Sequence, residues 1–138
     1  MQFSIFNDNN NRTMEFKIDT RDTYVHIEAP TTDINADMTS ALEELVGRLR
    51  QNGSRNYLID LSACQNADTT GLKNMLQIQE RCYGDGQSLV STGISKAVQE
   101  RAKELGIVEL WNAAPTEIEA IDIINMEVLE RDLFGEES

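Results

Sequence analysis

The sequence predicts an α/β fold in which a mixed, mostly parallel sheet carries packed helices. Two observations predict it. Two neighbouring segments near the start of the chain alternate apolar and polar residues, which is the period of half-buried strands. Strand-like and helix-like segments then alternate along the rest of the chain, and such alternation requires crossover connections between parallel strands. The expected order is ββαβαβαβα, or the same order with one extra leading strand.

The two opening strands are expected to pair as a hairpin. Apolar and polar residues alternate over 14–19 and again over 24–29, with a short turn between them. Pro30 ends the second strand because it has no N–H to donate to a neighbour. Residues 2–6 resemble a small leading strand, and the Asn-rich segment 7–11 would join it to the hairpin as a turn or a disordered link.

The remaining elements follow from changes of apolar period along the chain. Gly53 and Gly106 each follow a helical segment, in the position where glycine commonly ends a helix. The expected segments are a helix at 38–49, a strand at 56–61, a helix at 72–83, a strand at 88–91, a helix at 95–105, a strand at 108–111 and a helix from 116 onward.

The last expected helix is long and acidic. Thr116 and Glu119 have the spacing of a capping box. From residue 117 onward there are eight acidic residues and a single base, Arg131. Such a run is typical of a solvated helix face, and the alternative is a contact surface for a homodimer or a dedicated partner. The expected apolar stripe consists of Ile118, Ile121, Ile124 (or Asn125), Val128 and Leu129.

Charge and composition argue against several classes of protein. The chain has 24 acidic residues against 12 Lys and Arg, a formal net charge of -12. This charge disfavours direct binding to nucleic acid or to an anionic membrane and favours basic partners, or simply solubility. No apolar run approaches the ~20 residues of a membrane span, and residues 1–6 show no secretory signal. We therefore expect a cytoplasmic protein without membrane insertion.

The residues that most often carry catalysis are few. His26 is the single histidine, and it lies on an expected strand with no nucleophile adjacent in sequence. Cys64 and Cys82 are too few and too far from His26 for a structural metal site, so we expect both to be reduced and buried. Phosphate-binding loops, zinc-protease motifs and nucleophile elbows are absent from the sequence. The sequence therefore predicts no enzyme, no catalytic residue, no metal and no cofactor.

The most informative segment joins the central strand to the next helix. It has the sequence Tyr57-Leu58-Ile59-Asp60-Leu61-Ser62, continuing to Asp68-Thr69-Thr70-Gly71-Leu72. Asp and Thr often cap a helix, because their oxygens accept hydrogen bonds from the first N–H groups, and that structural role is one interpretation. The other is a phosphate acceptor, since a phosphorylated hydroxyl would face the positive end of the helix dipole. Gly71 would keep that approach uncrowded.

This segment resembles the STAS family, whose members carry a similar strand end and a D-S-S-G-L or D-T-T-G-L helix start. The matching text here is Ile59-Asp60-Leu61-Ser62 and Asp68-Thr69-Thr70-Gly71-Leu72. Two downstream segments, 94–99 and 105–107, are similar to the family's S-P-A-V and L-x-G-L segments. The resemblance implies a STAS domain at 14–124, a leading strand and linker at 1–13, and a helical extension of the same domain at 125–138.

The resemblance implies a phosphorylatable anti-sigma factor antagonist of a bacterial partner-switching pathway. Its partners would be a GHKL-type Ser/Thr kinase that is also the anti-sigma factor, and a PP2C-type phosphatase. By position the phosphorylated residue is Thr70, with Thr69 as the alternative. The partner-binding residues would be Asp68, Thr69, Thr70, Gly71 and Asp33.

Two other functions stay open at this point. One is a constitutive STAS subunit of a transporter or stress-signalling complex, without a phosphorylation switch. The other is weak nucleotide binding or hydrolysis, which no phosphate-binding loop supports.

Overall fold

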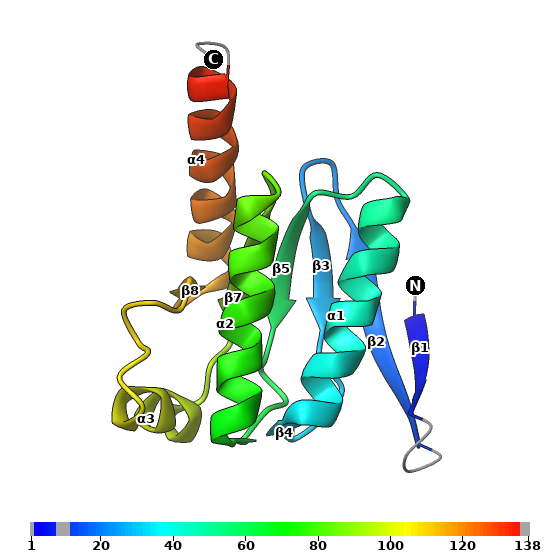
Figure 1. Cartoon of the computed structure of the whole chain (residues 1–138), viewed down its shortest axis with the longest axis vertical. Helices are drawn as coiled ribbons and strands as arrows, with labels where there is room; N and C mark the ends of the chain where they lie inside the picture. Colours follow the sequence, from blue (N-terminus) through cyan, green and yellow to red (C-terminus); the bar gives the residue numbers. More distant parts are fainter. Residues whose placement is uncertain (1, 8–11, 136–138) are drawn as a thin grey trace.

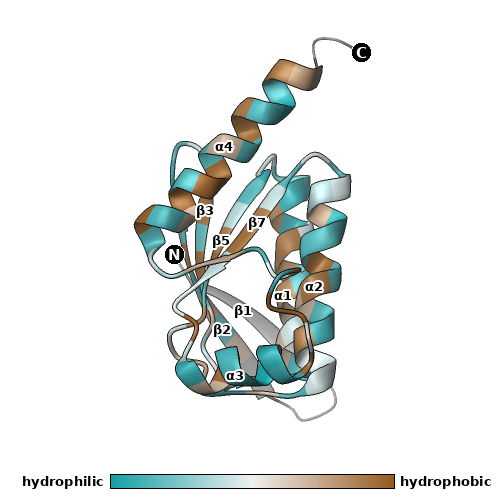
Figure 2. Ribbon diagram, turned by 90° about the vertical axis from the view of Figure 1, so that its left-hand side faces the viewer, coloured by the Kyte–Doolittle hydropathy of each residue, from teal (hydrophilic) through white to brown (hydrophobic). Residues whose placement is uncertain are grey.

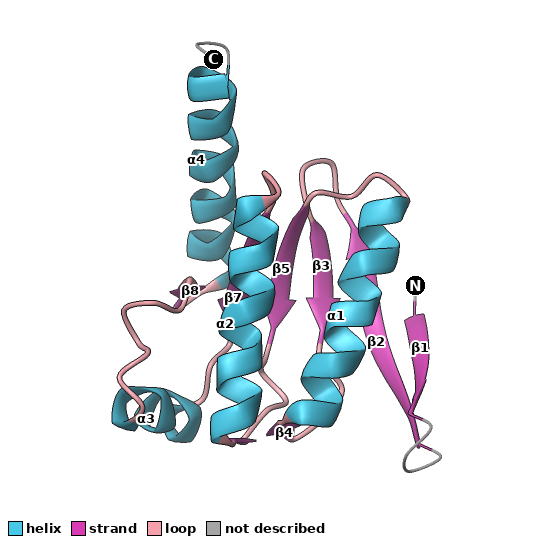
Figure 3. Ribbon diagram, in the orientation of Figure 1, coloured by secondary structure: helices cyan, strands magenta, loops and turns pink. Residues whose placement is uncertain are grey.

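The computed structural model describes residues 2–7 and 12–135, so most of the Asn-rich segment, at 8–11, lies outside the described residues. Its main sheet has six strands in the order β1-β2-β3-β5-β7-β8 (Figures 1 and 3). The strands of this sheet are β1 (Gln2–Asn7), β2 (Arg12–Thr20), β3 (Val25–Glu28), β5 (Asn56–Asp60), β7 (Ser88–Thr92) and β8 (Ala113–Ala114).

The pairing of the strands confirms the mixed sheet. β2 pairs with β1 and with β3 in antiparallel fashion. The pairs β3–β5, β5–β7 and β7–β8 are all parallel. The predicted hairpin is therefore present, and the leading strand extends it by one strand on the outer edge. The helices and the strands of the main sheet follow the predicted order that includes the extra leading strand.

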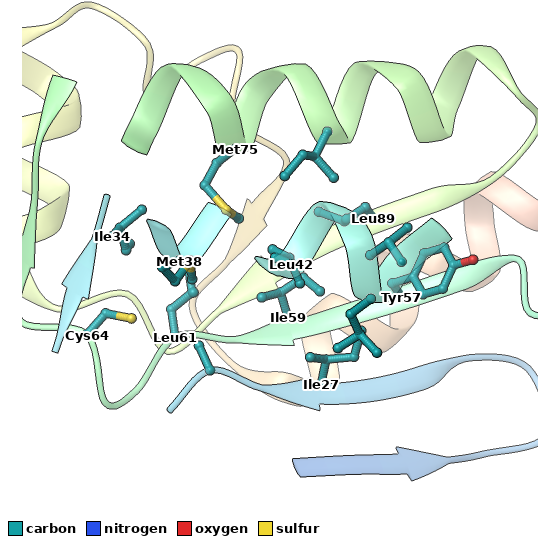
Figure 4. Packing of buried hydrophobic residues seen from close by; sticks show 14 of the residues in the cluster. Ile27, Ile34, Met38, Leu42, Tyr57, Ile59, Leu61, Cys64, Met75 and Leu89 are labelled. Atoms are coloured by element: carbon teal, nitrogen blue, oxygen red, sulfur yellow. The ribbon is translucent and has the colours of Figure 1, made fainter. Parts of the chain in front are cut away.

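Helices cover both faces of the sheet (Figure 2). α1 (Ala36–Gln51) and α2 (Thr69–Gly84) bury the large core, to which Ile27, Leu42 and Ile59 contribute (Figure 4). α4 (Glu117–Gly135) covers the other face, where a smaller cluster is built from Leu58, Val90, Ala114, Ala120 and Ile124. α3 (Lys96–Glu104) lies at the end of the sheet where α2 begins.

A short second sheet, which the sequence analysis did not predict, sets where α1 and α2 begin. β4 (Asp33–Ile34) pairs in parallel with β6 (Asn66–Ala67). Each of these strands leads within two residues into a helix, so the N-termini of α1 and α2 start side by side. The two helices are also joined by a side-chain hydrogen bond, because Asn74 Nδ2 donates to Thr39 Oγ1 over 3.1 Å.

The last strand is not where the sequence predicts it. Residues 108–110 form a turn, closed by the N–H of Trp111 donating to the carbonyl of Ile107, and the strand follows at Ala113–Ala114. Val108 and Leu110 are 51% and 62% exposed. The segment predicted as a strand at 108–111 is therefore a turn that buries Ile107 and Trp111 and leaves the three residues between them in solvent.

The apolar stripe of α4 is also partly different from the predicted one. Ile124 is fully buried, together with Ala120, which the stripe omitted. Ile118 and Leu129 are instead 74% and 58% exposed. The capping residue at the start of the helix is as expected, since Thr116 Oγ1 accepts a hydrogen bond from the N–H of Glu119.

Candidate functional site at the start of helix α2

The Asp-Thr-Thr-Gly segment forms the N-terminus of α2. Asp68 has extended backbone dihedrals and caps the helix, because its Oδ1 accepts a 2.6 Å hydrogen bond from the N–H of Gly71. The preceding strand β6 fixes the entry of the chain, since the N–H of Asp68 donates to the carbonyl of Ile34. The capping role proposed for Asp68 from sequence is therefore present.

The two adjacent threonines have different environments. Thr69 is half-buried, and its Oγ1 accepts a hydrogen bond from Arg101 Nη2 of α3 over 3.0 Å. Thr70 is exposed, and among the described residues its hydroxyl has no hydrogen-bond partner. Of the two candidate acceptors, Thr70 is thus the exposed residue, whereas the hydroxyl of Thr69 is bonded to α3.

Gly71 has a packing role that the sequence analysis did not foresee. It is buried, and a Cβ at this position would overlap the carbonyl oxygen of Ile34 and lie 2.8 Å from the Cα of Asn35. The start of α2 can approach the segment between β4 and α1 this closely only without a side chain. The absence of a side chain at Gly71 therefore makes room for the backbone of Ile34 and Asn35, and this close packing fixes the position of the preceding threonines.

The structure brings Asp33 to the same end of the molecule. Asp33 is exposed in β4 and is the register partner of Asn66, two residues before Asp68. Its carboxylate accepts a hydrogen bond from Thr32 Oγ1 over 3.2 Å. The β4–β6 pairing thus places the Asp33 backbone beside the strand that leads into α2.

Arg101 is the residue at this site that sequence reasoning missed. It lies 32 residues after Thr69 and is also bonded through Nη1 to Glu104 Oε2 over 3.0 Å. Nothing in the local sequence signals the contact, because it depends on how α3 packs against α2. An arginine is well suited to hold phosphate oxygens, since its planar guanidinium donates paired hydrogen bonds.

The start of α2 has features that would favour an anion at Thr70 and features that would oppose it. The positive end of the α2 dipole, carried by the first N–H groups of the helix, favours negative charge at this position. A phosphate on Thr70 would add about -1.5 to -2 charges at an exposed surface. The exposed carboxylates of Asp33 and Asp68 oppose that charge, and Arg101 offsets it.

A second polar cluster lies on the face of the sheet that carries α4. His26 Nε2 is 3.7 Å from Asp60 Oδ2 and 3.9 Å from Glu117 Oε1. Ser62 Oγ donates to Asp60 Oδ1, so this hydroxyl bonds the acid and not the imidazole. A nucleophile activated by histidine would need the hydroxyl on the imidazole, so the cluster does not have the geometry of a hydrolase triad.

Cys64 and Cys82 are buried in the core beneath the helices. Burial raises the pKa of each thiol to about 11, so both stay protonated near neutral pH. Within residues 2–7 and 12–135, no three His, Cys, Asp or Glu side chains gather as metal ligands would. In the same part of the chain, no helix combines the length and apolar content that crossing a bilayer requires.

Sequence comparison identifies the family of the chain. The family model described as "Mlab, STAS domain" matches residues 20–111, which is more than half of the chain. The chain therefore belongs to the STAS domain family. No curated protein sequence matches it.

Solved structures of similar fold agree with this assignment. A Thermotoga maritima protein described as an anti-sigma factor antagonist superposes with a TM-score of 0.68 at 15% identity, covering 80% of this chain and 94% of that one. An anti-sigma factor antagonist from Mycobacterium paratuberculosis gives 0.66 at 19% identity, covering 81% and 94%. The unphosphorylated form of the anti-sigma factor antagonist SpoIIAA gives 0.61 at 15% identity, covering 80% and 96%. At these identities the likeness establishes the shared fold.

Proposed function

We propose that this STAS protein is an anti-sigma factor antagonist whose activity is controlled by phosphorylation of Thr70. The observation that carries the proposal is that the two threonines differ in environment: Thr70 is exposed, whereas the hydroxyl of Thr69 is bonded to Arg101. In its unphosphorylated form the protein binds a GHKL-type Ser/Thr kinase, which is also the anti-sigma factor, in the cytoplasm. A PP2C-type phosphatase restores that form.

The proposed mechanism is electrostatic and needs no large change of conformation. A partner that docks on the start of α2 must bury the surface around Thr70 and Asp33. Phosphorylation adds a dianion to that surface, and burying it without a matched cation on the partner is costly. The partner therefore dissociates, while the helix N-terminus and Arg101 stabilise the phosphorylated form in the free protein.

In this proposal the protein acts by binding and performs no reaction itself. The kinase transfers the phosphoryl group of its nucleotide to Thr70 Oγ1, which loses its proton. The relatives known as anti-sigma factor antagonists support this class, and one of them is described in an unphosphorylated form.

The test is phosphosite mapping by mass spectrometry on the protein isolated from its native cells, with the co-purifying proteins identified alongside. Phosphate on Thr70 together with a GHKL-type kinase is the expected result. Thr70→Asp should abolish kinase binding, Thr70→Ala should retain it, and Thr69→Ala serves as the neighbouring control. If Thr70→Ala and Thr70→Asp both retain full function, and transporter or scaffold subunits co-purify instead, the protein is a constitutive subunit and the proposal is wrong.

A further inference from the structure

Helix α4 extends away from the sheet at the end of the molecule opposite the start of α2 (Figures 1 and 2). On its inner side, the buried residues Ala120 and Ile124 pack with Leu58 and Val90 of the sheet. Arg131 secures a later turn, since its Nη1 donates to Ser88 Oγ over 2.9 Å and its Nη2 to an oxygen of Asn56 over 3.0 Å. This inner side accounts for how the helix is held.

The outer side of the same helix carries a second set of apolar side chains. Ile118, Met126, Leu129 and Leu133 follow one another at steps of eight, three and four residues, which places them on one side of a helix. They are 74%, 61%, 58% and 58% exposed. We call these four residues the outer α4 stripe. On this side Asp122 lies four residues from both Ile118 and Met126, whereas Met126, Leu129 and Leu133 are adjacent to one another. Exposed apolar side chains gathered in this way mark an interaction site more often than a lone exposed residue does.

The exposed charged side chains of α4 itself are all acidic. Glu119, Asp122, Glu130 and Asp132 are exposed along the helix. The only base of α4 is Arg131, and its guanidinium is bonded to the sheet. The outer side of α4 therefore offers apolar contacts within a field of carboxylates.

We propose that the outer α4 stripe binds a basic amphipathic helix of another protein. Such a helix would lay its apolar face on the stripe, and its Lys or Arg residues would meet the flanking carboxylates. A second copy of this chain fits poorly, because a symmetric α4–α4 contact would bring the acidic residues of both helices together without cations between them.

This surface is separate from the candidate phosphorylation site. The stripe lies on α4, and Thr70 lies where α2 starts, at the other end of the molecule (Figure 1). A partner on α4 therefore leaves the start of α2 accessible. The inference goes beyond the proposed switch and does not depend on it.

The test uses the full chain, labelled with ¹⁵N for NMR, and a synthetic helical peptide of about 20 residues made of Leu and Lys, with Leu confined to one face. A peptide of the same composition with scrambled Leu positions controls for charge alone. A Leu and Glu peptide with the original pattern controls for apolar contact alone. We expect shift changes centred on α4 with the first peptide, and at least tenfold weaker binding of both controls.

Two sets of variants complete the test. Met126→Gln with Leu129→Gln should weaken binding at least tenfold, and Asp122→Asn with Glu130→Gln should reduce its sensitivity to salt. Val108→Gln with Leu110→Gln removes exposed apolar groups outside α4, and should leave binding unchanged. Circular dichroism establishes that each variant is folded.

Three results would overturn the proposal. The first is equal binding of the scrambled peptide, and the second is unchanged binding by the Met126 and Leu129 variant. The third is a dimer, detected by light scattering, that Leu129→Gln converts to monomers, since a second copy of the chain would then cover the stripe.

Discussion

Arg101 of α3 donates a hydrogen bond to the hydroxyl of Thr69 at the start of α2, over 3.0 Å. This contact makes two chemically identical neighbours unequal. It engages the oxygen of Thr69 and leaves the exposed hydroxyl of Thr70 as the more accessible acceptor. It also places the Arg101 guanidinium, which is paired with Glu104, on the residue that precedes Thr70.

The first prediction concerns this difference between Thr69 and Thr70 as phosphate acceptors, and it depends on the proposed phosphorylation. Arg101→Gln weakens the contact to Thr69, so phosphate should appear on Thr69 as well as on Thr70 in protein isolated from native cells. Phosphopeptide mapping measures the ratio of the two sites. Arg81→Gln, which removes an exposed ion pair with Glu43 on the neighbouring helices, is the matched control. A site ratio that Arg101→Gln leaves unchanged would show that this contact does not select the acceptor.

The second prediction separates the packing role of Gly71 from general helix propensity. Gly71→Ala should lower the free energy of unfolding by about 1–3 kcal/mol, because the new methyl group overlaps the backbone of Ile34. Gly47→Ala lies within α1 with no atom near the added methyl group. It should raise stability by up to about 1 kcal/mol. Urea unfolding measures both, and equal effects of the two substitutions would contradict the packing role.

Much of this fold could be predicted because the apolar periods are strong. The alternation over 14–19 and 24–29, and the run of apolar residues at 56–61, predicted strands where the structure has β2, β3 and β5. The prediction failed at 108–111 because the apolar residues Val108 and Leu110 lie on a turn in solvent, while Ile107 and Trp111, four residues apart, are the ones that are buried. Periodicity reports which side chains are buried, and it does not report the backbone hydrogen bonds that define a strand.

The candidate site could be located from sequence, but its internal contacts could not. The Asp68 cap follows from a local rule, since a cap and its partner are three residues apart. The contacts of Arg101 with Thr69 and of Gly71 with Ile34 join segments that are more than thirty residues apart. They depend on how the helices and the short β4–β6 sheet pack, which no single segment of the sequence encodes.

The third prediction tests the cap of α2. Asp68→Ala removes the acceptor for the N–H of Gly71, and should destabilise the protein by about 1 kcal/mol. Asp68→Asn keeps an acceptor oxygen and should recover most of that loss. Thermal unfolding compares the three proteins. If Asn destabilises as much as Ala, the charge of Asp68 and not its hydrogen bond is what stabilises the helix start.

The fourth prediction concerns how α4 is held on the sheet. Arg131→Ala removes the hydrogen bonds to Ser88 and Asn56, so the later turns of α4 should exchange their amide hydrogens faster. Hydrogen exchange with mass spectrometry measures this. Asp132→Ala, at the exposed neighbouring position, should leave the exchange rates near those of the parent. Similar acceleration in both variants would mean that helix propensity, and not the anchor, controls this region.

The last prediction is a loss of stability at alkaline pH that originates in the core. Burial raises the pKa of Cys64 and of Cys82 from the ordinary 9.0 to about 11. Between about pH 9 and pH 11, each thiol therefore keeps its proton in the folded protein, whereas the same thiol in the unfolded chain loses it. This contribution to stability is fully present below pH 9 and is lost as pH rises toward 11. Each pKa unit corresponds to about 1.4 kcal/mol.

A double variant, Cys64→Ala with Cys82→Ala, isolates that contribution. Its free energy of unfolding is expected to be lower at neutral pH because of the lost packing, but to fall less steeply between pH 9 and 10. Burial, and to a lesser extent Cys82, raises the pKa of Tyr57 from 10.0 to about 12, so the effect of Tyr57 on stability develops above pH 10, beyond this pH range. Urea unfolding at a series of pH values gives the slopes. Parallel slopes for the parent and the double variant would mean that the two thiols titrate in the folded protein as they do in the unfolded chain.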